Sequence, residues 1–329
     1  MNATAPERGP SRVDNVCHTL VGAAFGEAGL KHRTRFGAAA LMISANIPDV
    51  DVLVFLTGAS PIAFRRGITH GIVAQLLLPV LLTAILILVA RLRPRPPSDD
   101  SPPIRPGWLL LLTLAGVYSH VSLDWLNNYG VRVLTPFSWQ WFYGDSVFIV
   151  DPLLWLMLGV GVWLSRRHVA LRPARGALVF AACYIIVMVM SARAARGIVE
   201  RVWRETRGVA PVALMVGPIP VSPFTREVIV DAGDHYERGA FSWWSRSVTF
   251  FPEKIPKNAD RSEVAAATAT SPRIRAFLVW SRFPYWTIER QGERTQVFVA
   301  DMRFPNRGGT FFASAVVPTP PPAPDSTGQ

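Results

Sequence analysis

The sequence predicts a mainly α-helical, membrane-embedded bundle of about four transmembrane helices plus interfacial helices, followed by an extramembrane α+β or β-rich domain. Of the 329 residues, 50% are hydrophobic and only 17% are charged, which is too apolar for an average soluble domain. Several segments are long enough to cross a bilayer. After about residue 208 the pattern changes to short alternating runs that are typical of strands.

The longest apolar run covers residues 72–90 and is interrupted only by one Gln, one Pro and one Thr. About 20 apolar residues suffice to cross a bilayer, so this run predicts one span. Residues 15–30 and 36–47 are apolar but short or partly polar, and we expect interfacial helices or re-entrant hairpins there. Three further segments have the composition of a span: residues 108–125, 147–164 and 176–191.

The chain carries a net charge of +11, which by itself would be compatible with nucleic-acid binding. The arginines cluster at the ends of the expected spans, however, so the positive-inside rule explains them without a nucleic-acid partner. With the basic loops 91–105 and 166–175 in the cytoplasm, the segment after about residue 195 falls on the other side. We therefore expect a multi-pass protein with an extracytoplasmic C-terminal domain.

Composition divides the chain into five parts. The two ends are rich in proline and serine, as is the linker 93–106, and such segments are usually disordered. The part after residue 208 has strand signals, from which we expect a mixed sheet. The expected parts are a disordered tail (1–13), a membrane-embedded domain (14–192), a basic linker or helix (193–207), a β-rich domain (208–317) and a second disordered tail (318–329).

Histidine and aspartate recur within or beside the apolar segments, where ionisable groups are costly unless they are paired or bound to metal. His120 and Asp124 are four residues apart in an expected helix, so they project from one face and can bind one ion. Asp14 and His18 repeat that spacing in the first apolar segment.

Two further signals have the same character. Asp49 and Asp51 form an Asp-x-Asp pair at a helix end broken by proline, an arrangement that suits hard or borderline cations. His70 falls at the first turn of the longest apolar run. Under the expected topology, His70 lies at the same end of the spans as His120.

Together these signals predict a metal site. Its mixed nitrogen and oxygen ligands favour zinc, with manganese or iron as alternatives, and one or two ions would suit phosphoester hydrolysis. Arg65 and Arg66 would bind an anion, or they are interface anchors. Asp14, Asp145 and Asp151 would orient ligands or transfer protons. Each residue also has a simpler explanation as a helix cap or interfacial side chain.

At these residues the sequence resembles the YdjM-like family of bacterial proteins, which are predicted to be inner-membrane-associated, metal-dependent hydrolases. The resemblance covers roughly residues 14–165. It rests on five motifs: CHTLVG (17–22), IPDVD (47–51), RRGITHG (65–71), YSHVSLDWLNNYGVRVLTPF (118–137) and FYGDSVFIVDP (142–152).

That family is distantly similar to the zinc-dependent phospholipase C and P1 nuclease superfamily of helical enzymes. The resemblance implies a bacterial inner-membrane location, phosphoester hydrolysis, and six metal ligands: His18, Asp49, Asp51, His70, His120 and Asp124. The chain departs from the family pattern at Arg65 and at Val52, where members often have histidine. We therefore expect one or two metals and not three.

The first hypothesis is accordingly an integral-membrane hydrolase that cleaves a phosphoester of a small molecule or a lipid with metal-activated water. Its partners would be the lipid bilayer and that substrate, and the sequence identifies no protein partner. Two alternatives use the same residues differently. A cation or proton conduit would place polar groups along a path through both leaflets. A membrane-anchored binding module would act through its β-rich domain alone.

Overall fold

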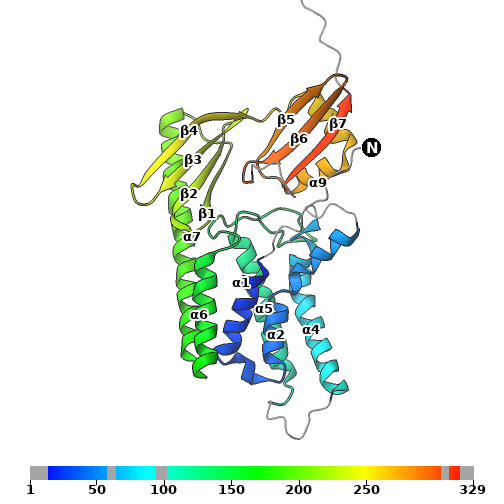
Figure 1. The fold of residues 1–329 in the computed structure, drawn as a ribbon, viewed down its shortest axis with the longest axis vertical. Helices are drawn as coiled ribbons and strands as arrows, with labels where there is room; N and C mark the ends of the chain where they lie inside the picture. The colour runs from blue at the N-terminus through cyan, green and yellow to red at the C-terminus, as the bar shows by residue number, and fades with distance from the viewer. Residues whose placement is uncertain (1–13, 58–63, 94–101, 305–310, 319–329) are drawn as a thin grey trace, which may run out of the picture.

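The computed structural model describes residues 14–57, 64–93, 102–304 and 311–318. A helical bundle carries two β-sheets at one of its ends (Figure 1). The bundle helices are α1 (Asn15–Glu27), α2 (Gly37–Ser44), α4 (Ile72–Leu92), α5 (Pro106–Leu126), α6 (Pro152–His168) and α7 (Arg172–Arg207). Residues 1–13, 94–101 and 319–329, which hold the expected disordered tails and most of the expected linker, lie outside the described residues.

Among the described helices, α4, α5 and α7 are long and apolar enough to cross a membrane. The fourth expected span, residues 147–164, is not confirmed. Its helix α6 begins only after Asp151, whose side chain accepts hydrogen bonds from the backbone N–H groups of Leu153 and Leu154. The cap moves the start of the helix to Pro152, and its 17 residues are fewer than those of α4, α5 and α7 and at the lower limit of the lengths that cross a bilayer.

The short helices α1 and α2 form a hairpin inside the bundle. The 3₁₀ helix η1 (Leu30–Arg33) joins them, and Thr34 just beyond it accepts a hydrogen bond from the backbone N–H of Arg105 at the start of α5. Close packing depends on small residues: a Cβ at Gly22 would lie 2.8 Å from Leu41 O, and one at Gly116 of α5 would overlap Ser44 Oγ. In a membrane, burial of hydrophobic surface does not drive helices together, and small residues stabilise the bundle by letting the helix backbones pack closely.

Helix α7 runs without interruption through residues 193–207, the segment expected as a basic linker or helix. Its last turns carry Ala195, Val199 and Trp203, which pack with Leu214 and Val228 of the first sheet in one apolar cluster. The helix therefore joins the bundle to the C-terminal domain as one continuous element.

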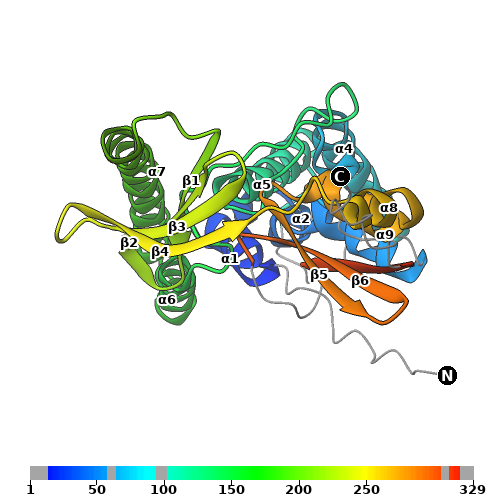
Figure 2. The same ribbon diagram turned by 90° about the horizontal axis from the view of Figure 1, so that it is seen from above.

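The C-terminal domain contains two sheets. The first has the order β1 (Ala213–Ile219), β2 (Ser222–Asp231), β3 (His235–Ser242) and β4 (Ser247–Pro256). The second has the order β5 (Pro284–Gln291), β6 (Arg294–Asp301) and β7 (Phe312–Pro318), with α8 (Ser262–Thr270) and α9 (Pro272–Trp280) packed beside it. Seen from above, the first sheet lies beside α7 and the second over the other half of the bundle (Figure 2).

The expectation of a mixed sheet is wrong for the described strands. Every strand pair is antiparallel. Neighbouring strands within each sheet follow one another in sequence, and most are joined by turns of a few residues. A parallel pair would need a crossover of a dozen or more residues.

Three arginines, of which Arg226 and Arg303 are buried, connect this domain to the loop between α5 and α6. Arg282 forms an ion pair with Asp145, at 2.9 Å from Oδ2. Arg226 of β2 donates hydrogen bonds to the backbone oxygens of Asp145 and Met188. Arg303 donates to the backbone oxygen of Asn128, at 2.8 Å. The loop that follows α5 is therefore held from above by side chains of the C-terminal domain.

Arg303 is itself fixed by Asp301, and both side chains are fully buried. Arg303 Nε lies 2.8 Å from Asp301 Oδ1, and Nη2 lies 3.0 Å from Oδ2. Burial alone would raise the pKa of Asp301, but the Arg303 guanidinium and the backbone N–H groups of Arg303 and Phe283 outweigh it and lower the pKa to about 2. The ionised pair therefore stabilises the folded state.

Replacing Asp301 with Asn should remove part of the acid sensitivity of the fold. A carboxylate with a depressed folded-state pKa stabilises fully above its unfolded pKa near 4, and the contribution disappears as the pH falls toward 2. Between about pH 5 and about pH 2, wild type should lose about 2 kcal/mol more unfolding free energy than Asp301→Asn. Tryptophan fluorescence during urea unfolding in detergent measures this difference. Equal losses in the two proteins would contradict it, and Asp260→Asn, at an exposed position, is the control.

Candidate metal centre

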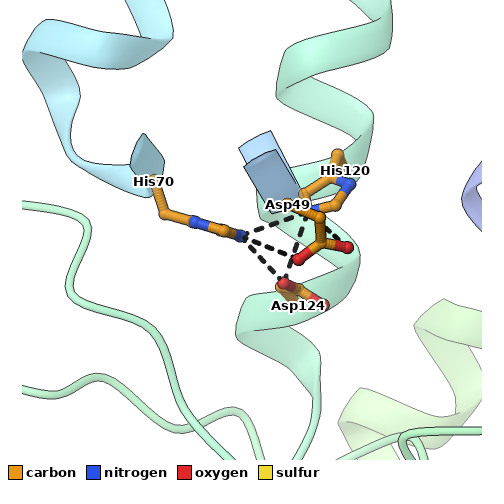
Figure 3. A group of neighbouring side chains, drawn as sticks. All are labelled: Asp49, His70, His120 and Asp124. Carbon is orange, nitrogen blue, oxygen red and sulfur yellow. Dashed lines mark hydrogen bonds and ion pairs between the residues drawn. The ribbon is translucent and has the colours of Figure 1, made fainter. Parts of the chain in front are cut away.

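Four buried side chains from three elements converge at the end of the bundle nearest the sheets. The 3₁₀ helix η2 (Ile47–Thr57) supplies Asp49, the short η3 (Ile68–His70) supplies His70, and the last turns of α5 supply His120 and Asp124. Each of the four offers one ligand atom, and these atoms all lie within 4.8 Å of one another. Figure 3 shows the imidazoles and carboxylates pointing toward a common centre.

The distances between these atoms fit a shared ion. His70 Nε2 lies 3.2 Å from both His120 Nε2 and Asp124 Oδ2, and His120 Nε2 lies 3.5 Å from Asp124 Oδ2. Asp49 Oδ2 lies 3.8 Å from His120 Nε2, and Asp49 Oδ1 lies 3.9 Å from His70 Nε2. Four ligands about 2.1 Å from one ion at the corners of a tetrahedron are about 3.4 Å apart.

Unsatisfied polar atoms point to the same conclusion. Both carboxylate oxygens of Asp49 are buried without a hydrogen-bond partner, and so are both ring nitrogens of His18. Buried polar atoms normally have partners because an unpaired group costs its full desolvation energy. Two histidines and two aspartates in contact, with orphaned oxygens among them, form a donor set that fits a divalent cation.

The orientation of the two central imidazoles is fixed from behind. His120 Nδ1 lies 2.8 Å from the backbone oxygen of Ala45, just after α2, and His70 Nδ1 lies 3.0 Å from Thr69 Oγ1. In both rings Nε2 is therefore the nitrogen that faces the centre. Such outer contacts commonly set the tautomer and direction of metal-binding histidines.

His18 lies directly beside the four-residue group. Its ring stacks on that of His120, with centroids 3.8 Å apart, and its Nε2 lies 3.5 Å from Asp124 Oδ1. Asp124 thus presents one oxygen to His70 and His120 and the other to His18. In this position the His18 ring could bind an ion or exchange a proton beside the four-residue group.

Asp51 occupies a supporting position. Its Oδ2 accepts hydrogen bonds from the backbone N–H of Arg66, at 2.7 Å, and from Thr69 Oγ1, at 3.3 Å, and it lies 3.7 Å from His70 Nδ1. The carboxylate therefore faces the rear nitrogen of His70, on the side away from the common centre. The structure places Asp51 behind His70 and Asp49 in front of it.

The predicted anion-binding arginines are buried within the same region. Arg66 Nη2 donates to Asp124 Oδ1 at 2.6 Å, and Nη1 donates to Asn127 Oδ1 at 3.0 Å. Arg65 Nη2 lies 3.8 Å from Asp49 Oδ1. Sequence reasoning missed a third buried arginine, Arg132, whose guanidinium stacks on two tryptophans and approaches the backbone of Arg65. Arg132 lies within the motif at residues 118–137, and this position is the feature of the sequence that could have identified it.

The three other predicted aspartates lie outside the four-residue group. Asp14 caps α1 through the N–H of Cys17 and accepts from Trp155 Nε1 at 2.9 Å. Asp151 caps α6 and accepts from Tyr184 at 2.9 Å. Asp145 is paired with Arg282 of the C-terminal domain. In the described residues, each of them joins two elements of the fold.

Fold and site together define a membrane-associated helical protein with a buried group of two histidines and two aspartates that could bind a metal. The chain belongs to the YdjM inner membrane protein family, whose family model matches residues 13–195. No curated protein and no solved structure matches the chain significantly. The similarity to the phospholipase C and P1 nuclease superfamily stays a prediction. The family match covers the bundle and ends before the β-strands begin.

The protein purified in detergent should bind a divalent metal, and His120→Ala and Asp124→Ala should each lose it. Removing either side chain leaves three members of the donor group and opens the site to water. Metal content by mass spectrometry after gel filtration measures the effect. His168→Ala, at the exposed end of α6, is the matched control and should keep the metal. Wild-type metal content in both site variants would contradict this assignment.

Proposed function

We propose that this protein is a multi-pass membrane hydrolase that cleaves a phosphoester at a divalent metal site formed by Asp49, His70, His120 and Asp124. The observation that carries the proposal is the convergence of these four buried side chains, with orphaned carboxylate oxygens, at one end of an apolar bundle. Such a group is costly near hydrocarbon unless an ion or a substrate repays the cost.

Zinc is the ion that this ligand set favours, with manganese or iron as alternatives. A bound divalent ion would polarise the phosphoryl oxygen. It would also lower the pKa of a water molecule bound to it, so that hydroxide is available at neutral pH. The four-residue group would hold one ion. His18 beside it would serve a second ion, or with one ion its Nε2 would accept the proton of the attacking water.

The charges around the site support an anionic substrate. Asp49 pairs with Arg65 and Asp124 with Arg66. With Asp51 and the nearby buried Arg132 counted as well, the formal charges of these six side chains cancel. A divalent ion would leave the site positive. A phosphoester would restore the balance, and guanidinium groups bind phosphate oxygens well.

The surroundings of the site favour a lipid-derived phosphoester. Ile68, two residues before His70, is 62% exposed. Phe137, in the loop packed against the start of α4, is 81% exposed, and Trp139 in the same loop is also exposed. The end of α4 where these residues lie is the end of a candidate span. Exposed aromatic side chains at that level are typical of the membrane–water interface.

The same geometry supports the proposed orientation. The arginine clusters at the ends of α4 and α6 lie at the opposite end of the bundle from the site. By the positive-inside rule that end would face the cytoplasm. The site and the C-terminal domain would then be extracytoplasmic.

A conduit is less well supported by the polar groups of the bundle. In the described part of the bundle, the buried polar side chains between the site and the far end are hydroxyls and an amide, such as Thr83, Thr113 and Gln75. Thr83 and Thr113 bond to each other, at 3.0 Å. A proton path would require ionisable groups or water at this depth. The distribution of polar groups favours a catalytic site at one face.

Zinc-loaded protein should hydrolyse phosphoesters, and chelation should abolish the activity until zinc is restored. Asp49→Asn should lower kcat/KM by at least about 100-fold, which is roughly 3 kcal/mol of transition-state stabilisation. Asp234→Asn, at an exposed turn of the C-terminal domain, is the control. Assays with phosphatidic acid in mixed micelles and with a soluble aryl phosphate separate lipid from small-molecule substrates. Metal-replete protein that cleaves neither these nor a phosphodiester panel would contradict the proposal.

A further inference from the structure

Tyr129 lies at the junction between the metal centre and the C-terminal domain. It follows the end of α5 by three residues, yet its side chain is only 5% exposed because it belongs to the apolar core of the second sheet. Its ring lies 5.1 Å from that of Trp280, centroid to centroid, and 6.3 Å from that of Phe311. A bundle residue thus forms part of the core of another domain.

The backbone of this segment is held by the same domain. Trp280 Nε1 donates to Tyr129 O at 3.2 Å. Arg303 Nη1 donates to Asn128 O at 2.8 Å and lies 3.4 Å from Tyr129 O. Because Arg303 is locked by the buried carboxylate of Asp301, these donors have little freedom to move.

The Tyr129 ring also supports the metal centre. The guanidinium of Arg66 lies over it, with Cζ 4.7 Å from the ring centroid, and the same guanidinium donates to Asp124 and Asn127. Asn127 Oδ1 in turn accepts from the backbone N–H of Tyr129 at 2.9 Å. A cation held over an aromatic face in a buried site is attracted by the ring and restricted in orientation.

We propose that Tyr129 is a positioning residue through which the C-terminal domain holds Arg66 against Asp124, so that this domain is part of the metal centre. The inference rests on the proposed metal-dependent function and extends it beyond residues 13–195, the part that the family model matches. It implies that the β-domain does more than cover the bundle. It sets the direction of a carboxylate that faces three histidines.

The decisive comparison is between Tyr129→Leu and Tyr129→Phe in the full-length protein in detergent. Leu keeps an apolar side chain but removes the ring face under Arg66, whereas Phe retains the ring. Zinc affinity is measured by competition with a chelating dye, and the site geometry by the visible absorption of bound Co²⁺. Tyr129→Leu should weaken zinc binding by about 10- to 100-fold, the range for losing an outer partner of a metal ligand, and should shift the Co²⁺ bands.

Tyr129→Phe should retain both the zinc affinity and the Co²⁺ spectrum of the wild-type protein. Phe241→Leu, in the core of the first sheet, controls for loss of stability and should lower Tm without a change in the Co²⁺ bands. Wild-type affinity and spectrum in Tyr129→Leu would overturn the inference, as would an equal loss in Phe241→Leu.

A second variant covers the case in which Tyr129→Leu does not fold. Trp280→Phe removes the N–H donor to Tyr129 O and keeps an aromatic ring, and it should weaken zinc binding by about 10-fold. Unchanged affinity there would also overturn the inference. Wild-type protein that binds neither zinc nor Co²⁺ would be a different result, since it refutes the proposed metal site itself.

Discussion

Asp124 is a carboxylate buried at the end of an apolar helix, and the surrounding side chains pair with its negative charge. Its Oδ1 accepts from Arg66 and faces His18, while its Oδ2 faces His70 and His120. A charge taken out of water must be paired and hydrogen-bonded, or it destabilises the fold strongly. Removing Asp124 would take away the carboxylate partner of the buried Arg66 guanidinium and a carboxylate that faces all three imidazoles.

This constraint connects parts of the chain that are far apart in sequence. The α1–α2 hairpin brings His18 and the backbone oxygen of Ala45 to α5, which requires the close approach at Gly22 and Gly116. The C-terminal domain reaches the same point from the opposite side, through Arg303 and the segment that follows α5. The candidate metal centre therefore lies where the hairpin, α5 and the segment held by the second sheet meet.

Much of the bundle could be predicted because the relevant signals are local. Apolar length indicated α4 and α5, and the four-residue spacing of His120 and Asp124 placed both side chains on one helix face. The choice between Asp49 and Asp51 could not be made in this way, because alternate positions in a short 3₁₀ helix face different sides of His70. The position of Tyr129 could not be predicted for a related reason: its partners in the core of the second sheet, such as Trp280, are more than 100 residues away in the chain. Helix α6 was expected to begin earlier, near residue 147, because apolar composition does not reveal the cap at Asp151.

X-ray absorption at the metal edge of the purified protein tests the central claim most directly, since it reports the ligands without an assay for activity. We expect a shell of nitrogen and oxygen at about 2.0–2.1 Å, with the outer scattering of two or three imidazoles and no sulfur at about 2.3 Å. A sulfur-dominated shell, or a metal surrounded by oxygen alone without imidazole scattering, would contradict a centre built from His70, His120, Asp49 and Asp124.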